Sequence, residues 1–359
     1  MNHKIVSLII CLFLMGFFYG CSGGSSGGGG AISLEETLPV SIASPADGFA
    51  IEEGEPFDFQ GTISDGTAPY TCSWNFDGGA DDASVEDPGD VFFVAPGKYT
   101  VTFAVTDSNG DSGSATVDVR VKRTLLEDLV ISSVADIEAF QTEGYTDIDG
   151  GLDIKGTDLV DLSGFENLIS VGGDLYMEYN GALTSLAGLD NITSVGGGLN
   201  IQGNNALTSL AGLENLTSVG GNLWIQFNDA LTSLAGLENL TSVGGLSIGY
   251  NDALTSLAGL DNITSVGGGL VIEGNNALTS LAGLENLTSV GHNLVIYGNE
   301  ALTSLDLVDL CFVGGAFTIR YNGQLCQTFA TDLRDQVIAC QGGEIVGGVT
   351  LSENRGDCP

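Results

Sequence analysis

A phrase close to ALTSLAGLENLTSVGG recurs along the chain with a period of 23 or 24 residues. Its copies begin at Ala182, Ala206, Ala230, Ala253, Ala277 and Ala301. A fixed period of this length is typical of a solenoid, in which each repeat forms one coil and buries its apolar side only against neighbouring coils. The sequence therefore predicts a stack of short coils.

Between the copies lie variable segments with the pattern L-x-[IML]-x-x-N, which predicts a strand that ends at an asparagine. Offsets are counted here from the first residue of each pattern. These first residues are Leu152, Leu175, Leu199, Leu223, Leu246, Leu270, Leu294 and Phe317. Offsets +1 and +3 are expected to point away from the core, because successive side chains of a strand alternate, and +4 lies at the end of the strand.

The remaining positions of each coil predict how the stack is held together. Apolar residues recur at offsets +8, +11, +14, +17 and +20, as in Leu207, Leu210, Leu213, Leu216 and Val219. Gly-Gly pairs end most coils and permit a tight corner. Asparagine at offset +5 can satisfy backbone groups at each turn when the coils stack. These asparagines are Asn180, Asn204, Asn228, Asn251, Asn275, Asn299 and Asn322.

The last residues predict a closed end of the solenoid. Phe329, Leu333 and Val337 follow the i, i+4 spacing of a helix, and residues 349–354 restore the strand pattern as a ninth strand. A helical cap is expected because the last coil of a solenoid has an apolar edge without a neighbour.

Cysteine placement indicates an oxidising compartment. Four cysteines lie close together near the C-terminal end and are expected to form disulfides: Cys311, Cys326, Cys340 and Cys358. Four cysteines can pair in three ways, and the sequence does not choose among them. Their spacing lacks the C-x-x-C pairs of a zinc site, so no metal is expected there. Cys72 is left over and is expected to be a buried thiol.

Residues 40–122 predict a small antiparallel β domain, since alternating runs are separated by turn residues at the spacing of a sandwich. The stretches W-N-F-D-G-G at residues 74–79, P-G-K-Y-T-V at 96–101 and V-T-D-S-N-G at 105–110 resemble the polycystic-kidney-disease-type (PKD) domain. This resemblance implies an immunoglobulin-like sandwich that acts as a spacer and carries no chemistry.

Residues 123–149 predict a linker and an N-terminal cap. Ser133 is expected to cap a short helix from Val134 to Gln141, with Ile137 and Phe140 facing inward. The entry sequence at residues 133–140, the Gly-Gly corners and the lack of helical stretches within coils resemble the receptor L-domain family. That family is a right-handed β-helix related to leucine-rich repeats, which binds proteins or peptides or is structural.

The predicted fold is therefore all-β. The immunoglobulin-like, PKD-like β-sandwich is followed by a right-handed β-helix or leucine-rich-repeat-like solenoid of about eight coils over residues 150–322. A disulfide-tied cap over residues 323–359 completes the chain.

Residues 1–20 predict a targeting segment, with Lys4 before an apolar run that is too short to span a membrane comfortably. The residues F-Y-G-C at 18–21 resemble the lipobox of bacterial lipoproteins, which implies a lipid on Cys21. The Gly/Ser-rich start of residues 21–39 predicts a flexible tether. We expect a lipid-anchored protein of the bacterial cell envelope, at the outer membrane or cell surface; the alternative is an ordinary secretory signal.

Charge excludes several classes of partner. Lys and Arg number 9 against 46 Asp and Glu, which gives a formal net charge of −37. Nucleic acids and anionic membrane surfaces are therefore not expected to bind, because both attract Lys and Arg. Neither catalytic residues nor a cofactor are expected, since His292 is the single histidine after residue 20 and no catalytic set can be assembled around it.

One offset of the repeat predicts a row of like charges, formed by Asp190, Glu214, Glu238, Asp261 and Glu285. We expect these carboxylates to be exposed to water and screened by salt. Bridging of neighbouring carboxylates by calcium is less favoured, because calcium takes six to eight oxygens and each coil offers one carboxylate. Weak binding of a divalent cation is left open.

Five N-x-T sequons formally match N-glycosylation sites and begin at Asn191, Asn215, Asn239, Asn262 and Asn286. They recur because the coil recurs, and turn formation by asparagine is the favoured interpretation.

The variable strands give the strongest indication of a function, because seven aromatic residues lie at their outward offsets among polar neighbours. The expected ligand-binding face comprises Tyr176, Glu178, Tyr179, Gln202, Trp224, Gln226, Phe227, Tyr250, Glu273, Tyr297, Arg320 and Tyr321. Tyr and Trp supply much of the contact energy at interfaces, so an extracellular protein or glycan is the expected partner. The alternatives are a structural spacer, in which aromatics simply suit strands, and, third, an enzyme.

The lipobox-like sequence generates a direct test. Replacing Cys21 with Ser removes the thiol that would carry the lipid, so the variant should move from the membrane fraction to the soluble fraction. Mass spectrometry of the parent should find an acylated Cys21. Identical fractionation of parent and variant, with no acyl group on Cys21, would refute lipid anchoring.

Overall fold

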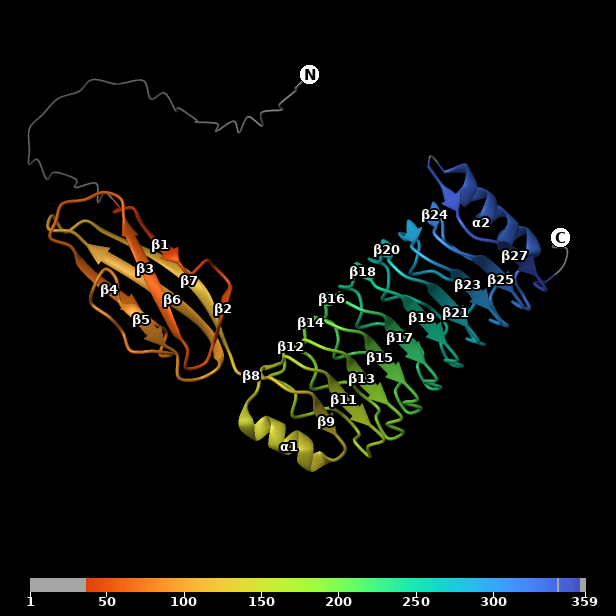
Figure 1. Cartoon of the computed structure of the whole chain (residues 1–359), viewed down its shortest axis with the longest axis horizontal. Coiled ribbons are helices and arrows are strands. Elements are labelled where there is room, and N and C mark those ends of the chain that lie inside the picture. The colour runs from red at the N-terminus through yellow and green to blue at the C-terminus, as the bar shows by residue number, and fades with distance from the viewer. Residues whose placement is uncertain (1–36, 341, 356–359) are drawn as a thin grey trace, which may run out of the picture.

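The computed structural model describes residues 37–340 and 342–355. The expected signal peptide, Cys21, most of the tether and Cys358 lie outside these described residues. Two bodies follow one another along the chain, a β-sandwich and a long solenoid (Figure 1). Among the described residues, no helix has the length and apolar character needed to cross a bilayer.

The N-terminal body is the predicted β-sandwich. One sheet has the order β1-β3-β5, with β1 (Val40–Ser44), β3 (Pro56–Ile63) and β5 (Gly89–Phe92). The other has the order β2-β7-β6-β4, with β2 (Phe49–Glu52), β7 (Ser112–Lys122), β6 (Gly97–Thr106) and β4 (Thr71–Asn75). The strands pair antiparallel, except that β2 runs parallel to β7.

Aromatic residues form the core between these two sheets. Trp74 and Phe103 stack with ring centroids 4.5 Å apart, and Phe59 meets Trp74 edge-on at 5.9 Å. Cys72 is a free, buried thiol in this core, as the sequence predicts, and its burial raises its pKa above the ordinary value. The sandwich thus has a hydrophobic core separate from that of the solenoid.

The solenoid is built on one long parallel sheet of ten strands (Figure 1). In spatial order these are β9 (Leu129–Ile131), β11 (Leu152–Lys155), β13 (Leu175–Glu178), β15 (Leu199–Gln202), β17 (Leu223–Gln226), β19 (Leu246–Gly249), β21 (Leu270–Glu273), β23 (Leu294–Tyr297), β25 (Phe317–Arg320) and β27 (Val349–Ser352). Every long strand pairs in register with the equivalent residues of the next coil. The predicted ninth strand is confirmed as β27, which pairs with β25.

A second side of each coil carries a two-residue strand that the sequence analysis missed. One short sheet contains β8 (Thr124–Leu125), β10 (Asp147–Ile148), β12 (Ser170–Val171), β14 (Ser194–Val195) and β16 (Ser218–Val219). The other contains β18 (Ser242–Val243), β20 (Ser265–Val266), β22 (Ser289–Val290), β24 (Phe312–Val313) and β26 (Glu344–Ile345). The segment expected as linker and cap, residues 123–149, thus contributes β8, β9 and β10 to the solenoid sheets.

Leucines fill the interior of the solenoid as one continuous core. The predicted inward offsets are all buried in the central coils, as Leu207, Leu210, Leu213, Leu216 and Val219 show. Glycine is required where the coils approach at the corner, because a Cβ added to Gly220 would lie 2.2 Å from the carbonyl oxygen of Gly196. The sequence pattern therefore predicted the buried positions of the coils correctly.

The asparagines at offset +5 form a buried ladder, as predicted. In a central coil, Asn228 donates its backbone N–H to Oδ1 of Asn251 at 3.1 Å and its Nδ2 to the carbonyl of Ile201 at 2.9 Å. Its own Oδ1 accepts the backbone N–H of Asn204 at 3.0 Å. Each amide thus satisfies backbone groups on both sides of its turn, and the coils are locked in register.

Helix α1 (Val134–Glu143) covers the N-terminal end of the solenoid, with Ile137 and Phe140 buried as expected (Figure 1). The predicted side-chain cap by Ser133 is wrong. Its hydroxyl donates to Oδ2 of Asp136 at 2.9 Å instead of accepting a helix N–H. The charged carboxylate of Asp136 is a strong acceptor, and it orients the Ser133 hydroxyl as a donor.

Helix α2 (Gln327–Ala339) packs at the C-terminal end. Leu333 and Val337 are buried there as predicted, whereas the prediction for Phe329 is wrong: Phe329 is exposed, and Ala330 takes the inward position, because it lies three residues before Leu333 on the same helix face. A disulfide joins Cys311 to Cys340, which fixes one of the pairings that the sequence left open.

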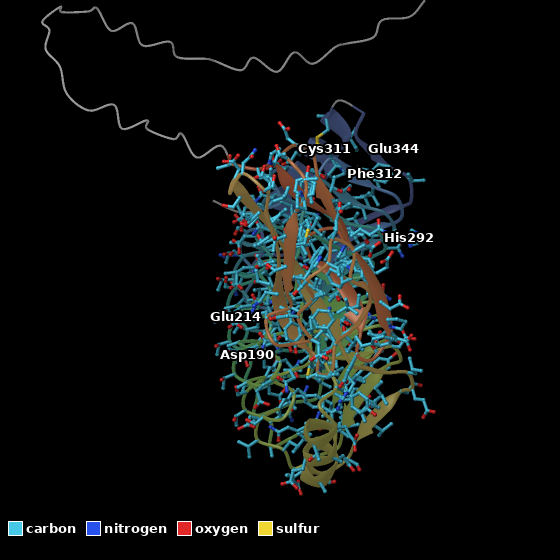
Figure 2. All side chains as sticks on the ribbon, turned by 90° about the vertical axis from the view of Figure 1, so that its left-hand side faces the viewer. Asp190, Glu214, His292, Cys311, Phe312 and Glu344 are labelled. Atoms are coloured by element: carbon cyan, nitrogen blue, oxygen red, sulfur yellow. A yellow bond between two sulfur atoms is a disulfide. The ribbon has the colours of Figure 1, made fainter. Side chains whose placement is uncertain are left out.

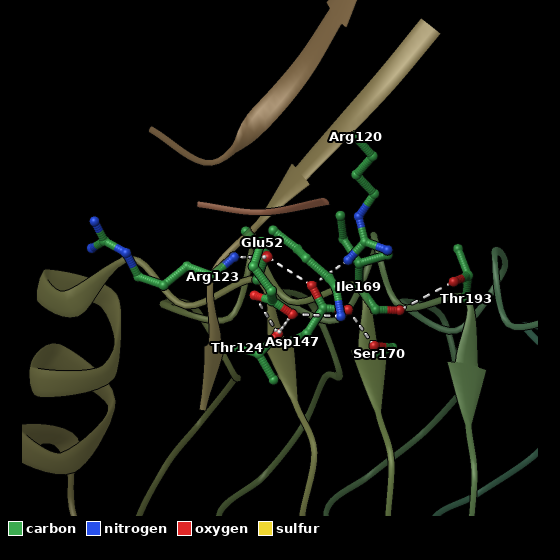
Figure 3. A network of polar contacts seen from close by, with 10 residues as sticks. Glu52, Arg120, Arg123, Thr124, Asp147, Ile169, Ser170 and Thr193 are labelled. Carbon is green, nitrogen blue, oxygen red and sulfur yellow. Dashed lines mark hydrogen bonds and ion pairs between the residues drawn. The ribbon is translucent and has the colours of Figure 1, made fainter. Parts of the chain in front are cut away.

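The sandwich and the solenoid are joined by charged contacts (Figure 3). One residue, Arg123, separates β7 from β8, and its guanidinium binds Glu53 of the sandwich through an ion pair that includes an Nη2–Oε1 contact of 2.8 Å. The hydrogen bond from Arg123 lowers the pKa of Glu53 below the ordinary value. Arg120 of β7 pairs with the buried Asp147 of β10. The junction is therefore held by contacts between the two bodies as well as by the chain.

Two substitutions test the packing of the solenoid. Leu234→Ala removes a fully buried side chain and should lower the free energy of unfolding by about 2 to 5 kcal/mol. Asn228→Ala leaves backbone groups of the ladder unpaired and should lower it by about 1 to 3 kcal/mol. Denaturant unfolding measures both.

Gly181→Ala serves as the control, because an added Cβ there meets no atom within 4 Å. Unfolding curves that coincide for the parent, Leu234→Ala and Asn228→Ala would contradict the role of these offsets in the core.

Candidate binding face of the solenoid

The outward side of the long sheet is named the variable face and consists of offsets +1, +3 and +4 of strands β11 to β25. The residue at offset 0, which is leucine in every strand except β25, where it is Phe317, and the apolar residue at +2 are buried in each of these strands. The side chains at +1 and +3 therefore point outward, as the alternation predicts. All twelve residues expected in the binding face lie on this one surface.

The backbone at offset +4 has a left-handed conformation in every coil from β11 to β27. Four coils place glycine there, at Gly156, Gly203, Gly274 and Gly298, with φ between 63° and 69°. The other coils place Tyr179, Phe227, Tyr250, Tyr321 and Glu353 there, with φ between 56° and 58°. A side chain in this region costs about 1 to 2 kcal/mol relative to the right-handed region, a cost that glycine avoids. The sequence analysis did not foresee this strain.

The four aromatic residues at offset +4 are named the corner row: Tyr179, Phe227, Tyr250 and Tyr321. They are exposed, with Tyr179 the most accessible at 55%. The rings of Phe227 and Tyr250 stack 4.8 Å apart with an interplanar angle of 4°. Tyr321 meets Tyr297 edge-on at 5.2 Å.

Glycine in the next coil leaves room for the rings of the corner row. A Cβ added to Gly203 would lie 2.7 Å from Cδ1 of Tyr179, and one added to Gly274 would lie 2.6 Å from Cδ1 of Tyr250. Each of these tyrosine rings therefore occupies the space above the glycine that follows it along the solenoid. At these two places, the glycine that follows a tyrosine at the corner makes room for the tyrosine ring.

Trp224 is the most prominent residue at offset +1. Its register partners on the two neighbouring strands, Asn200 and Ser247, are only 5% and 9% exposed, whereas Trp224 is 38% exposed. The alternation predicts that Asn200 and Ser247 are exposed at offset +1, yet both are buried. Tyr176 is half-buried, and its hydroxyl donates to Asp174 at 2.7 Å, which raises the pKa of Tyr176.

Polar side chains at offset +3 line the corner row. Gln202 donates through Nε2 to the hydroxyl oxygen of Tyr179 at 3.1 Å, and Gln226 donates to Ser247 at 2.7 Å. Glu273 raises the pKa of Tyr250 by electrostatic repulsion of the phenolate. Hydrogen-bonding groups therefore run beside the exposed rings.

Ion pairs mark the two ends of the variable face. At the N-terminal end, Lys155 pairs with Glu178 at 2.7 Å and lies 5.8 Å from the centre of the Tyr179 ring. At the C-terminal end, Arg320 pairs with Glu353 at 2.6 Å and lies 4.9 Å from the centre of the Tyr321 ring. These contacts hold the outer rings of the row in place.

The carboxylate row lies elsewhere, with Asp190 and Glu214 on one side of the solenoid and His292 on the other (Figure 2). Each acid accepts the backbone N–H of the glycine two residues before it, as Glu238 does from Gly236 at 2.9 Å. The sequence analysis missed this role, for which the constant spacing of glycine and acid was the available signal. Across residues 37–340 and 342–355, no group of three or more His, Cys, Asp or Glu is placed to hold a metal ion.

The sequon asparagines also serve the fold. Asn239, for example, donates its Nδ2 to the carbonyl of Glu214 in the preceding coil at 2.6 Å, and the other four make the equivalent bond. This bond supports the interpretation of these residues as turn formers.

Comparisons with known proteins agree with the architecture. Residues 42–121 match the PKD domain family, and residues 242–337 match the receptor L domain family. A comparison with curated proteins gave no match. Among solved structures, fibronectin(III)-like modules of Clostridium thermocellum CbhA are similar at 19% identity, over 23% of this chain and 94% of that chain, with a TM-score of 0.21.

The two family matches fall on the two bodies that the structure separates. The receptor L domain match begins at β18, and the coils before it continue the same sheet in the same register. Both resemblances predicted from the sequence are thereby confirmed: the N-terminal sandwich is a PKD-like domain and the solenoid is receptor L domain-like.

Proposed function

We propose that the chain is a non-catalytic recognition protein of the bacterial cell envelope, whose variable face binds an extracellular protein or glycan. The observation that carries this proposal is the contrast within each coil. The buried positions repeat almost unchanged, whereas the outward strand positions differ from coil to coil and expose aromatic rings. Exposed aromatic clusters usually mark an interaction site.

The strained backbone of the corner row supports recognition over a purely structural role. Glycine occupies the same corner in four coils of this solenoid, so the fold itself does not need a ring there. Residues that hold an unfavourable backbone conformation cluster at functional sites. The aromatic residues therefore serve a purpose that glycine would not fulfil.

The remaining parts of the chain fit a display function. A lipid on Cys21 and the Gly/Ser-rich tether would hold the protein at the membrane, and the PKD-like domain would act as a spacer. Because Arg123 and Arg120 bind across the junction, the spacer presents the solenoid in a defined direction. No cofactor is part of this proposal.

A structural spacer without a ligand is the competing function. In its favour, Phe227 and Tyr250 stack and Tyr321 contacts Tyr297 edge-on, so these rings bury part of their surface against one another. The two functions differ in one consequence, because only a recognition protein loses binding when the rings are removed.

Replacement of Tyr176, Trp224 and Tyr250 with Ser tests the proposal. Binding of the full-length chain to cells or extracellular matrix should fall by about tenfold or more, since one aromatic hot spot can contribute about 2 kcal/mol. Folding should survive with a modest loss, because none of the three side chains belongs to the solenoid core. Cell-binding assays and thermal unfolding measure the two effects.

The matched control carries Asp190→Asn, Glu214→Gln and Glu238→Gln on a different side of the coil. It should bind as the parent does, because the amides preserve an oxygen acceptor for the glycine N–H. Equal binding by parent, aromatic variant and control would reject recognition by the variable face and favour the structural spacer.

A further inference from the structure

The corner row runs along the solenoid and across the strands. Its four rings project from the same backbone position in four of the seven coils from β13 to β25, and those coils are joined in register by the long sheet. Parallel strands lie about 4.8 Å apart, so the six coil steps from Tyr179 to Tyr321 span about 29 Å. Tyr297, whose ring contacts Tyr321, extends the aromatic surface into the interval after Tyr250.

We propose that the corner row is the docking surface for a linear, uncharged polysaccharide built of pyranose units, which lies along the solenoid axis. This inference rests on the proposed recognition function and names the class of ligand. The sugar rings would pack on Tyr179, on the Phe227–Tyr250 pair and on the Tyr297–Tyr321 pair.

The shape of the surface favours an extended polymer over a folded protein. Hot spots between proteins concentrate in well-packed central pockets. The cavity of about 400 Å³ beside the variable face is lined by residues of the first coils, such as Asp128, Asp153 and Tyr176, and by no residue of the corner row. The rings instead lie at whole multiples of the coil spacing along one line, and that spacing is close to the length of one pyranose unit in an extended chain, so a repeating ligand could meet them in step.

The chemistry of the row fits a sugar. The C–H groups on the face of a pyranose ring pack against the electron-rich face of an aromatic ring. Sugar hydroxyls need donors and acceptors beside that contact, and Gln202, Gln226 and Glu273 at offset +3 provide both. Gly298, where an added Cβ would meet no atom within 4 Å, leaves the corner open between Tyr250 and Tyr321, so a continuous chain meets no bulky side chain there.

The acidic charge of the chain argues against an anionic polymer as the ligand. Glu178 and Glu353 are neutralised by Lys155 and Arg320, and Glu273 forms no ion pair among the described residues. The chain as a whole carries a formal charge of −37. A polyanion, such as a uronic-acid polymer or a nucleic acid, would be repelled at long range.

The test uses affinity electrophoresis of the full-length chain in gels that contain hydroxyethylcellulose, xylan, mannan or a soluble β-1,3-glucan, with polygalacturonate as the anionic comparison. At least one neutral polymer should retard the parent, and polygalacturonate should not. The variant Tyr179→Gly with Tyr250→Gly should lose about tenfold or more in affinity for that polymer. Its melting temperature should be unchanged or higher, because glycine relieves the left-handed strain.

Two further variants separate stacking from other effects. Tyr179→Phe with Tyr250→Phe keeps both rings and should retain binding, whereas Phe329→Ser removes an exposed aromatic ring on α2, away from the face, and should bind as the parent does. Loss of binding in the Phe variant would overturn the stacking contact. A fall in melting temperature together with lost binding in the Gly variant would assign the corner row a structural role instead.

The outcomes also distinguish this inference from the proposed function. If no neutral polysaccharide retards the parent, while the variant lacking Tyr176, Trp224 and Tyr250 still loses binding to cells, the polysaccharide is excluded and recognition of a protein stands. Retardation by polygalacturonate alone would overturn the charge argument. Retention of full affinity for a neutral polymer by the Gly variant would move the site away from the corner row.

Discussion

The buried asparagine ladder is the interaction on which the solenoid depends. The asparagine amides from Asn180 to Asn322 are fully enclosed, and each bonds to backbone groups of adjacent coils, as Asn228 does. Thr157 begins this row and Asn354 ends it. A buried polar group without a partner costs about 1 to 3 kcal/mol, so a shift of register by one residue would break a series of such bonds. The ladder therefore fixes which residues of neighbouring coils lie side by side, and the leucine core and long sheet follow from that register.

Because the ladder and the core use the inward positions, the outward positions are free to differ. Offset +4 precedes each asparagine of the ladder and must adopt the left-handed backbone that brings the amide inward. The side chain at that corner is then placed on the surface by the fold, whichever residue it belongs to. Aromatic residues at Tyr179, Phe227, Tyr250 and Tyr321 convert this structural corner into a line of exposed rings, and the site thus depends on the same turn that holds the stack together.

Side-chain contacts also join the solenoid to the PKD-like domain. Asp147 is buried at the start of the solenoid, where it accepts hydrogen bonds from Thr146 and Ser170 and pairs with Arg120 of β7 (Figure 3). Removal of one partner from a buried pair leaves an uncompensated charge, so such contacts resist separation of the two bodies. These contacts fix the PKD-like domain to the first coil of the solenoid.

The sequence by itself determined the features that follow from local periodicity. The leucine offsets, the asparagine row, the outward direction of +1 and +3, and the helical ends at α1 and α2 all repeat with the coil or follow helical spacing, because burial of apolar and polar groups imposes those periods. The tertiary structure alone decided contacts between coils and at the ends. Local backbone geometry sets the left-handed corner at Tyr179 and the hydrogen bond from Gly236 to Glu238. Neighbours far along the chain decide the burial of Asn200 and the pairing of Cys311 with Cys340. A periodic pattern shows which positions are equivalent, but the space, the backbone angle and the partner at each of them are set by the packed coils.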